Sequence, residues 1–116
     1  MDNGNGVRRG ELTSAMNATK WDELRLLMHG LPFVTEYRVT HTNGHLKAAP
    51  DSEWFYHFPA GGTADILHVD ISPRESGDWD ALLEAVRSLR LPAALMDQGV
   101  RVYGYIGPGQ SVSVLD

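Results

Sequence analysis

The sequence predicts an α+β fold in which an antiparallel sheet of about five to six strands is covered on one face by two main helices. Two segments carry apolar residues at the three- and four-residue spacing of a helix, whereas most others alternate apolar and polar residues or are rich in β-branched and aromatic residues. The predicted strands occur in runs between and after the two helices. This order favours an antiparallel sheet over a parallel one.

Length and composition limit the class of protein. The chain has 116 residues, of which 42% are hydrophobic, so it can form the core of a single domain. It has neither an apolar run long enough to cross a membrane nor the apolar core of a signal peptide, and we therefore expect a cytoplasmic protein without membrane contact. The absence of cysteine excludes disulfides, thiolate zinc sites and cysteine nucleophiles.

Net charge bears on the choice of partner. The formal charge of −5 opposes binding to a nucleic-acid backbone, which requires clustered lysine and arginine, so we expect no nucleic-acid partner. The same charge suits a basic protein partner.

The first 17 residues differ from the rest of the chain. They are rich in Asn, Gly and Ser and show no apolar periodicity, which predicts a flexible leader over residues 1–17 and a single domain over residues 18–116. Met16 directly precedes the ordered pattern and is an alternative start to Met1.

The first predicted helix begins at Thr19, which stands with Asp22 at capping-box-like spacing, and ends at Gly30 and Pro32. Its apolar stripe comprises Trp21, Leu24, Leu27, Met28 and Leu31.

The next segment, FVTEYRVTH at 33–41, has the composition of a strand. Asn43-Gly44 is a strong hairpin-turn signal, so a short returning strand is expected over residues 45–48. The side of strand 33–41 expected to face the core comprises Phe33, Thr35, Tyr37, Val39 and His41.

The stretch EWFYHFPAGGTADILHVDI at 53–71 predicts a second hairpin with its turn at Gly61-Gly62. In that register Trp54 faces Val69 and Tyr56 faces Leu67, while Phe58 faces Asp65. The core face would then comprise Trp54, Tyr56, Phe58, Leu67, Val69 and Ile71.

The second helix is predicted in SGDWDALLEAVRSLRLP, capped by Ser76 or Asp78 and closed by Pro92. A linking segment, PAALMDQG, leads to a strand in VRVYGYI, a type II turn at Gly107-Pro108-Gly109 and a final strand in SVSVL.

The outer face of the 53–71 hairpin suggests a metal site. His57 and His68 would be diagonal neighbours with Asp70 and Glu53 behind them, and two imidazoles with a carboxylate suit Zn or Fe. The preferred alternative is a solvated face whose histidines pack beside Phe55 and Ile66. On that interpretation the protein holds no cofactor.

No nucleophile elbow, P-loop or dinucleotide fingerprint is present in the sequence. The remaining signal is a sheet rich in aromatic and acidic residues. Such a sheet suggests a binding surface, because Tyr and Trp are good interface anchors and acids steer basic partners. The expected binding residues are Phe55, Tyr103, Tyr105, Glu53, Asp70 and Asp51.

Several landmarks resemble a family of small uncharacterised bacterial proteins. They are TKWDELRLLMHGLPF, EWFYHF, ADILHVDI, a capped helix and VRVYGYIG, which together span about residues 18 to 107. Proteins of this size and style are frequently immunity proteins, which protect a cell from a secreted toxin. The resemblance implies an α+β fold and an immunity role, and assigns no catalytic residue.

These observations favour a cytoplasmic immunity protein that occludes a basic toxin domain without chemistry of its own. One alternative is a metal-binding protein or hydrolase-type enzyme that uses His57, His68 and Asp70. Another is a homodimer that pairs its own sheets or sheet edges.

Overall fold

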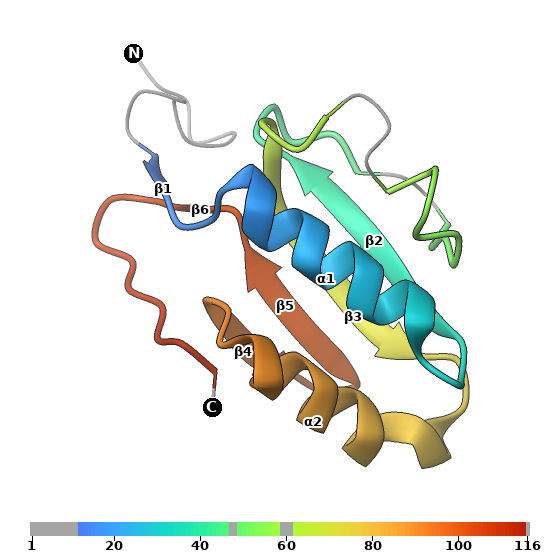
Figure 1. Ribbon diagram of the computed structural model, residues 1–116. Coiled ribbons are helices and arrows are strands. Elements are labelled where there is room, and N and C mark those ends of the chain that lie inside the picture. The colour runs from blue at the N-terminus through green and yellow to red at the C-terminus, as the bar shows by residue number, and fades with distance from the viewer. Residues whose placement is uncertain (1–11, 47–48, 59–61, 116) are drawn as a thin grey trace.

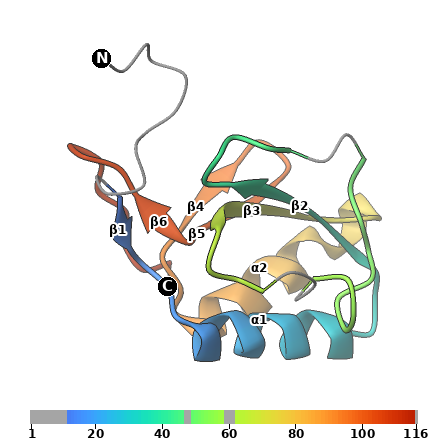
Figure 2. The ribbon, with the colours of Figure 1, turned by 90° about the horizontal axis from the view of Figure 1, so that it is seen from above.

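The computed structural model describes residues 12–46, 49–58 and 62–115, and shows two helices packed against one face of an antiparallel sheet (Figures 1 and 2). The α+β class and the placement of the helices are thus confirmed. The elements are β1 (Thr13–Ser14), α1 (Ala18–Gly30), β2 (Thr35–His41), β3 (Ile66–Pro73), a 3₁₀ turn (Ser76–Asp78), α2 (Trp79–Leu89), β4 (Ala93–Met96), β5 (Gly99–Tyr103) and β6 (Tyr105–Ile106).

The strands form two sheets instead of the single sheet expected. The larger has the order β2-β3-β5-β4, and β1 pairs with β6 in a separate two-stranded sheet. The chain leaves the large sheet at Gly104, whose amide donates to Leu67 O and whose carbonyl accepts from Ala15 N. The predicted strand in VRVYGYI is therefore divided between the two sheets.

Helix α1 begins one residue earlier than predicted. Its N-cap is Asn17, whose side chain accepts a hydrogen bond from Lys20 N, so the expected cap at Thr19 is wrong. The helix ends at Gly30 as predicted, and its buried side chains are Trp21, Leu24 and Met28.

Strand β2 begins at Thr35, two residues later than predicted, and the turn that follows it agrees with the prediction. Thr35 and Tyr37 are buried, and Gly44 has the positive φ of 88° that favours glycine. Backbone bridges from Thr40 to Leu46 and from Tyr37 to Asp51 lie beside the outer edge of β2. Part of the predicted returning strand falls on residues 47–48, outside the described residues.

The predicted 53–71 hairpin is wrong. Residues 54–58 form turns, and β3 pairs with β2 and β5. Trp54, Phe58, Val69 and Ile71 are buried as expected, whereas Tyr56 is 74% exposed. Trp54 and Phe58 therefore reach the core from a compact turn and not from a strand. Leu67, the other expected core residue, is only half-buried, where a bulge interrupts β2–β3 pairing.

The C-terminal third contains one strand that was not predicted and lacks another that was. Helix α2 ends at Leu89, and its C-cap Arg90 has the left-handed conformation. AALM then forms β4, the edge strand beside β5. The predicted strand SVSVL is wrong, because only Val114 forms a bridge, to Pro92. The GPGQ turn is confirmed by the hydrogen bond from Gln110 N to Gly107 O.

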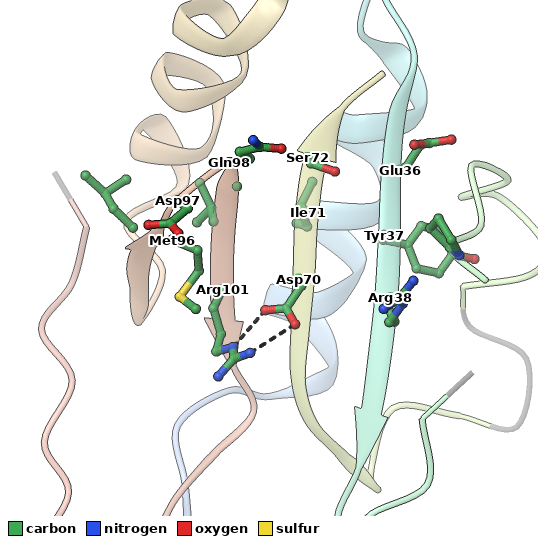
Figure 3. A pocket seen from close by; sticks show the side chains of 14 residues that line it. Glu36, Tyr37, Arg38, Asp70, Ile71, Ser72, Met96, Asp97, Gln98 and Arg101 are labelled. Atoms are coloured by element: carbon green, nitrogen blue, oxygen red, sulfur yellow. Dashed lines mark hydrogen bonds and ion pairs between the residues drawn. The ribbon is translucent and has the colours of Figure 1, made fainter. Parts of the chain in front are cut away.

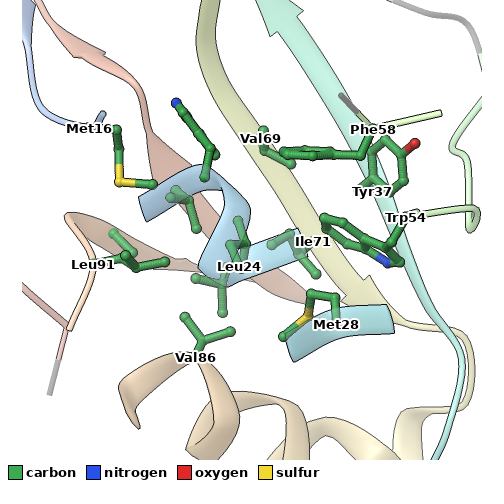
Figure 4. Packing of buried hydrophobic residues seen from close by; sticks show 14 of the residues in the cluster. Met16, Leu24, Met28, Tyr37, Trp54, Phe58, Val69, Ile71, Val86 and Leu91 are labelled. Atoms are coloured by element: carbon green, nitrogen blue, oxygen red, sulfur yellow. The ribbon is translucent and has the colours of Figure 1, made fainter. Parts of the chain in front are cut away.

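The core lies between the large sheet and the helices (Figure 4). Met16 is 9% exposed and belongs to it, so the fold begins within the segment expected to be a leader. Residues 1–11 of that segment lie outside the described residues. Within the described part of the chain, neither helix is long and apolar enough to cross a membrane.

Candidate functional site

Residues 51–58, here called the 51–58 turn, are anchored in the core by an aromatic side chain. Trp54 is 3% exposed, and its indole Nε1 donates to the Thr35 hydroxyl at 2.9 Å. Its ring lies 4.4 Å from that of Tyr37 and 5.0 Å from that of Phe58 (Figure 4). The polar atom of the buried indole therefore has a hydrogen-bond partner, and Trp54 fixes the turn to β2 on its core-facing side.

Two acidic side chains hold the backbone of the turn. Asp51 Oδ1 accepts from Glu53 N at 2.9 Å, and the Glu53 carboxylate accepts from Tyr56 N at 2.8 Å. The Tyr37 hydroxyl donates to Glu53 O at 2.8 Å. Burial raises the pKa of Tyr37, and the charges of Asp51 and then Glu53 raise that pKa further. Tyr37 consequently stays neutral and keeps its proton for this bond.

The turn directs Phe55 and Tyr56 away from the core. Tyr56 is 74% exposed and Phe55 is 37% exposed, and their rings meet edge to face at 4.8 Å. Phe55 packs against α1, where the guanidinium of Arg25 lies 4.9 Å from the ring centre and donates to Phe55 O at 2.9 Å. His29 lies on the same ring at 5.1 Å. Phe55 is thus held at the surface by two side chains of α1, and Tyr56 rests against the ring of Phe55.

Acidic groups accompany the aromatic pair. Arg25 also donates to Asp22 Oδ1, which fixes the guanidinium and places a carboxylate beside it.

Three of the predicted binding residues, Phe55, Glu53 and Asp51, belong to one site. Tyr56 and Arg25 were missed, because strand periodicity assigned Tyr56 to the core and nothing in the local sequence links Arg25 to a residue thirty positions away.

The other three predicted binding residues lie elsewhere. Asp70 and Tyr103 are on the sheet face away from the helices, and the Tyr105 hydroxyl of β6 donates to Ala64 O. The six residues therefore do not form one surface.

The proposed metal ligands are also separated. His57 Nδ1 lies 3.0 Å from Asp51 Oδ2, whereas His68 Nδ1 lies 4.0 Å from Asp70 Oδ2. Among the residues that the structure describes, no group of three or more His, Asp or Glu side chains could hold a metal ion. The expected convergence of His57, His68 and Asp70 is wrong, because it depended on the hairpin register that does not form.

Asp70 is instead an ion-pair partner of Arg101 on the uncovered sheet face (Figure 3). Arg101 Nε donates to Oδ1 at 2.7 Å and Nη2 to Oδ2 at 3.2 Å. The hydrogen bond to Asp70 raises the pKa of Arg101. Burial lowers the pKa of His68, and the nearby charge of Arg101 lowers it further, although Asp70 opposes the shift. His68 is therefore neutral at pH 7.

The lowered pKa of His68 predicts a pH-dependent stability. The imidazole binds a proton more weakly in the folded chain than in the unfolded chain, where its pKa is about 6.5. Its contribution to the free energy of unfolding should thus be complete above pH about 6.5 and should fall as the pH drops towards the folded pKa. We expect denaturant unfolding between pH 7.5 and about 5 to show a smaller loss for His68→Gln than for the unchanged chain.

Both chains are measured under the same conditions. An equal slope of the free energy of unfolding with pH in His68→Gln and in the unchanged chain would contradict the assignment.

Comparisons with known proteins identify a family. The family model of DUF6678, described as a family of unknown function, matches residues 5–109. A search of curated proteins and a search of solved structures found no match.

Proposed function

Since the chain belongs to DUF6678, a family of unknown function, its role has to be argued from its own surface, and we propose that it is a non-catalytic protein that binds a partner through the 51–58 turn. The observation that carries the proposal is the exposure of Phe55 and Tyr56 on a turn whose backbone is fixed from the inside. Neither ring is needed to fill the core, which Trp54 and Phe58 already reach from the same turn.

Preorganisation makes the turn suitable for binding. Trp54, Glu53 and Arg25 already fix its conformation, so little conformational entropy is lost when a partner closes over it. Tyr is among the residues that most often dominate binding energy at interfaces, because its ring is large and its hydroxyl can find a polar partner. We infer that Tyr56 enters a pocket on the partner, while Phe55 and Arg25 form the contact around it.

Charge favours a basic partner. Asp22 lies beside the aromatic pair through its contact with Arg25, Glu53 accepts from Tyr56 N, and the whole chain carries a formal charge of −5. Acids at the edge of an interface increase the rate of encounter with a positively charged surface.

The partner that best fits this chemistry is a bacterial toxin domain with a basic active-site cleft, and the role is that of a cytoplasmic immunity protein that occludes it. Enzymes that act on nucleic acids concentrate positive charge where the phosphates bind. An acidic turn with a protruding tyrosine is complementary to such a cleft. The test is co-expression with a secreted toxin encoded beside this gene: protection by the unchanged chain supports the role, and killing at the same rate with and without the chain contradicts it.

Tyr56→Ala tests whether the 51–58 turn binds the partner. We expect the variant to weaken partner binding by about 2 kcal/mol, or roughly thirtyfold in Kd, because the ring is removed from the centre of the contact. Calorimetric titration against a partner identified by photo-crosslinking from position 56 would measure the change.

Val114→Ala is the control, because Val114 is 49% exposed and belongs to the C-terminal segment beside Pro92. It should leave Kd unchanged. The free energy of unfolding should move by less than about 0.5 kcal/mol in both variants, since both side chains are exposed. Unchanged binding in Tyr56→Ala would remove the 51–58 turn from the proposal.

A further inference from the structure

The sheet face away from the helices carries two parallel rows of side chains that cross the strands (Figure 3). Cross-strand pairing defines the first row, which runs Arg38, Asp70, Arg101 and Ala94. The second row lies two residues along each strand, about 7 Å away. It contains Glu36, Ser72, Gly99 and Met96.

The face is hollowed between these rows. A depression of about 690 Å³ is lined by the residues of both rows other than Ala94, with the β4–β5 turn at one side and Pro50 at the other. Gly99 deepens the depression because it has no side chain to fill it. A larger residue does not fit there without a shift of the sheet, since a Cβ would lie 2.5 Å from Ile71 O. The charged side chains lie along the sheet and are only partly exposed: 30% for Glu36, 35% for Asp70 and 29% for Arg101. Each of them already makes an ion pair within the single chain, Glu36 with Arg74 and Asp70 with Arg101.

We propose that a second copy of the chain covers this face, with a two-fold axis that lies between the sheets and runs across the strands. Such an axis places the first row of one copy on the second row of the other. Arg38 then meets Glu36 of the second copy, and Asp70 meets the hydroxyl of Ser72. Arg101 lies over the hollow at Gly99, and Ala94 meets Met96.

Charge favours this arrangement over one whose axis runs parallel to the strands and is centred on β3. An axis parallel to the strands and centred on β3 would bring Arg38 of one copy onto Arg101 of the other, which are like charges. The axis across the strands brings opposite charges together twice, because each contact in a two-fold interface occurs in both directions. Glu36 keeps its exposed contact with Arg74, at 3.3 Å, since a carboxylate can accept from two guanidinium groups.

A charge exchange tests the arrangement. Sedimentation of the unchanged chain should show a dimer that dissociates on dilution. Arg38→Glu gives two Glu–Glu contacts and Glu36→Arg gives two Arg–Arg contacts, so each variant alone should raise the dimer Kd by about a hundredfold or more. An equal mixture of the two variants restores opposite charges at both contacts. It should form a heterodimer with a Kd within about tenfold of the original.

The exposed pair Lys20 and Glu23 on α1 gives the control. Lys20→Glu and Glu23→Lys should each leave the dimer intact. Thermal unfolding checks that every variant folds. If the charge variants do not fold, Ser72→Asp replaces them, because it sets a carboxylate against Asp70 of the second copy and should also weaken the dimer.

A chain that sediments as a monomer at every concentration would overturn the proposal and leave the face to solvent or to another protein. A dimer that survives Arg38→Glu, Glu36→Arg and Ser72→Asp would overturn it as well, because the copies would then be joined elsewhere. These outcomes do not depend on the 51–58 turn.

Discussion

Replacing Trp54 by alanine is expected to lower the free energy of unfolding by about 3–5 kcal/mol, the usual cost of removing a buried large aromatic side chain. The side chain is 3% exposed and contacts the rings of Tyr37 and Phe58, so its loss leaves a cavity between β2 and the 51–58 turn. It also leaves the Thr35 hydroxyl without its indole donor. Folded domains are stable by about 5–15 kcal/mol, and this single change would therefore remove a large part of the total.

Denaturant unfolding followed by circular dichroism measures the effect, and two variants make it specific. Trp54→Phe keeps an aromatic ring and loses the hydrogen bond, so its cost should be intermediate. Phe55→Ala removes the neighbouring, partly exposed ring and should cost less than half as much as Trp54→Ala. Equal costs for Trp54→Ala and Phe55→Ala would show that the turn is not anchored as described.

Gly104→Ala is expected to destabilise the fold by about 3 kcal/mol, near the upper end of the ordinary cost of overpacking. A Cβ at this position would overlap Ile66 O and lie 3.0 Å from Cζ2 of Trp21. The backbone cannot move away easily, because Gly104 N donates to Leu67 O and Gly104 O accepts from Ala15 N. The clash is thus with a carbonyl of β3 and not with the end of a flexible side chain.

Gly30 provides the comparison for this prediction. It is the last residue of α1, and a Cβ there would meet nothing within 4 Å. Gly30→Ala should therefore be neutral or slightly stabilising by the same measurement. A Gly104→Ala variant as stable as Gly30→Ala would mean that the junction of the two sheets is looser than the structure shows.

The elements that could be predicted are those whose signal is local. The apolar spacing of Trp21, Leu24 and Met28 depends only on helical geometry, and the turn at Asn43-Gly44 depends only on positive φ at glycine. The cap at Asn17 was missed because Thr19, two residues later, offered an equally good pattern. β4 was missed because AALM, at four residues, is too short to show a periodicity.

Part of the candidate site was predictable and part was not. Phe55, Glu53 and Asp51 were identified from residue type, since aromatic side chains anchor interfaces and acidic ones steer basic partners. The exposure of Tyr56 and the contact with Arg25 were not, because they depend on a turn closed by the Glu53 side chain and on the position of α1. His57 and His68 do not form the predicted metal site for a related reason. The distance between them depends on which strand pairs with β3.

The sequence by itself determined the α+β class, the two helices, β2 and most of the core, because each follows from the periodicity or turn chemistry of a few neighbouring residues. Only the tertiary structure decided that β3 lies between β2 and β5, that residues 54–58 form turns, and that Asp70 pairs with Arg101. Strand partners are chosen by contacts between residues far apart in the chain. An alternating sequence such as EWFYHF fits a strand and a compact turn equally well until its partners are known.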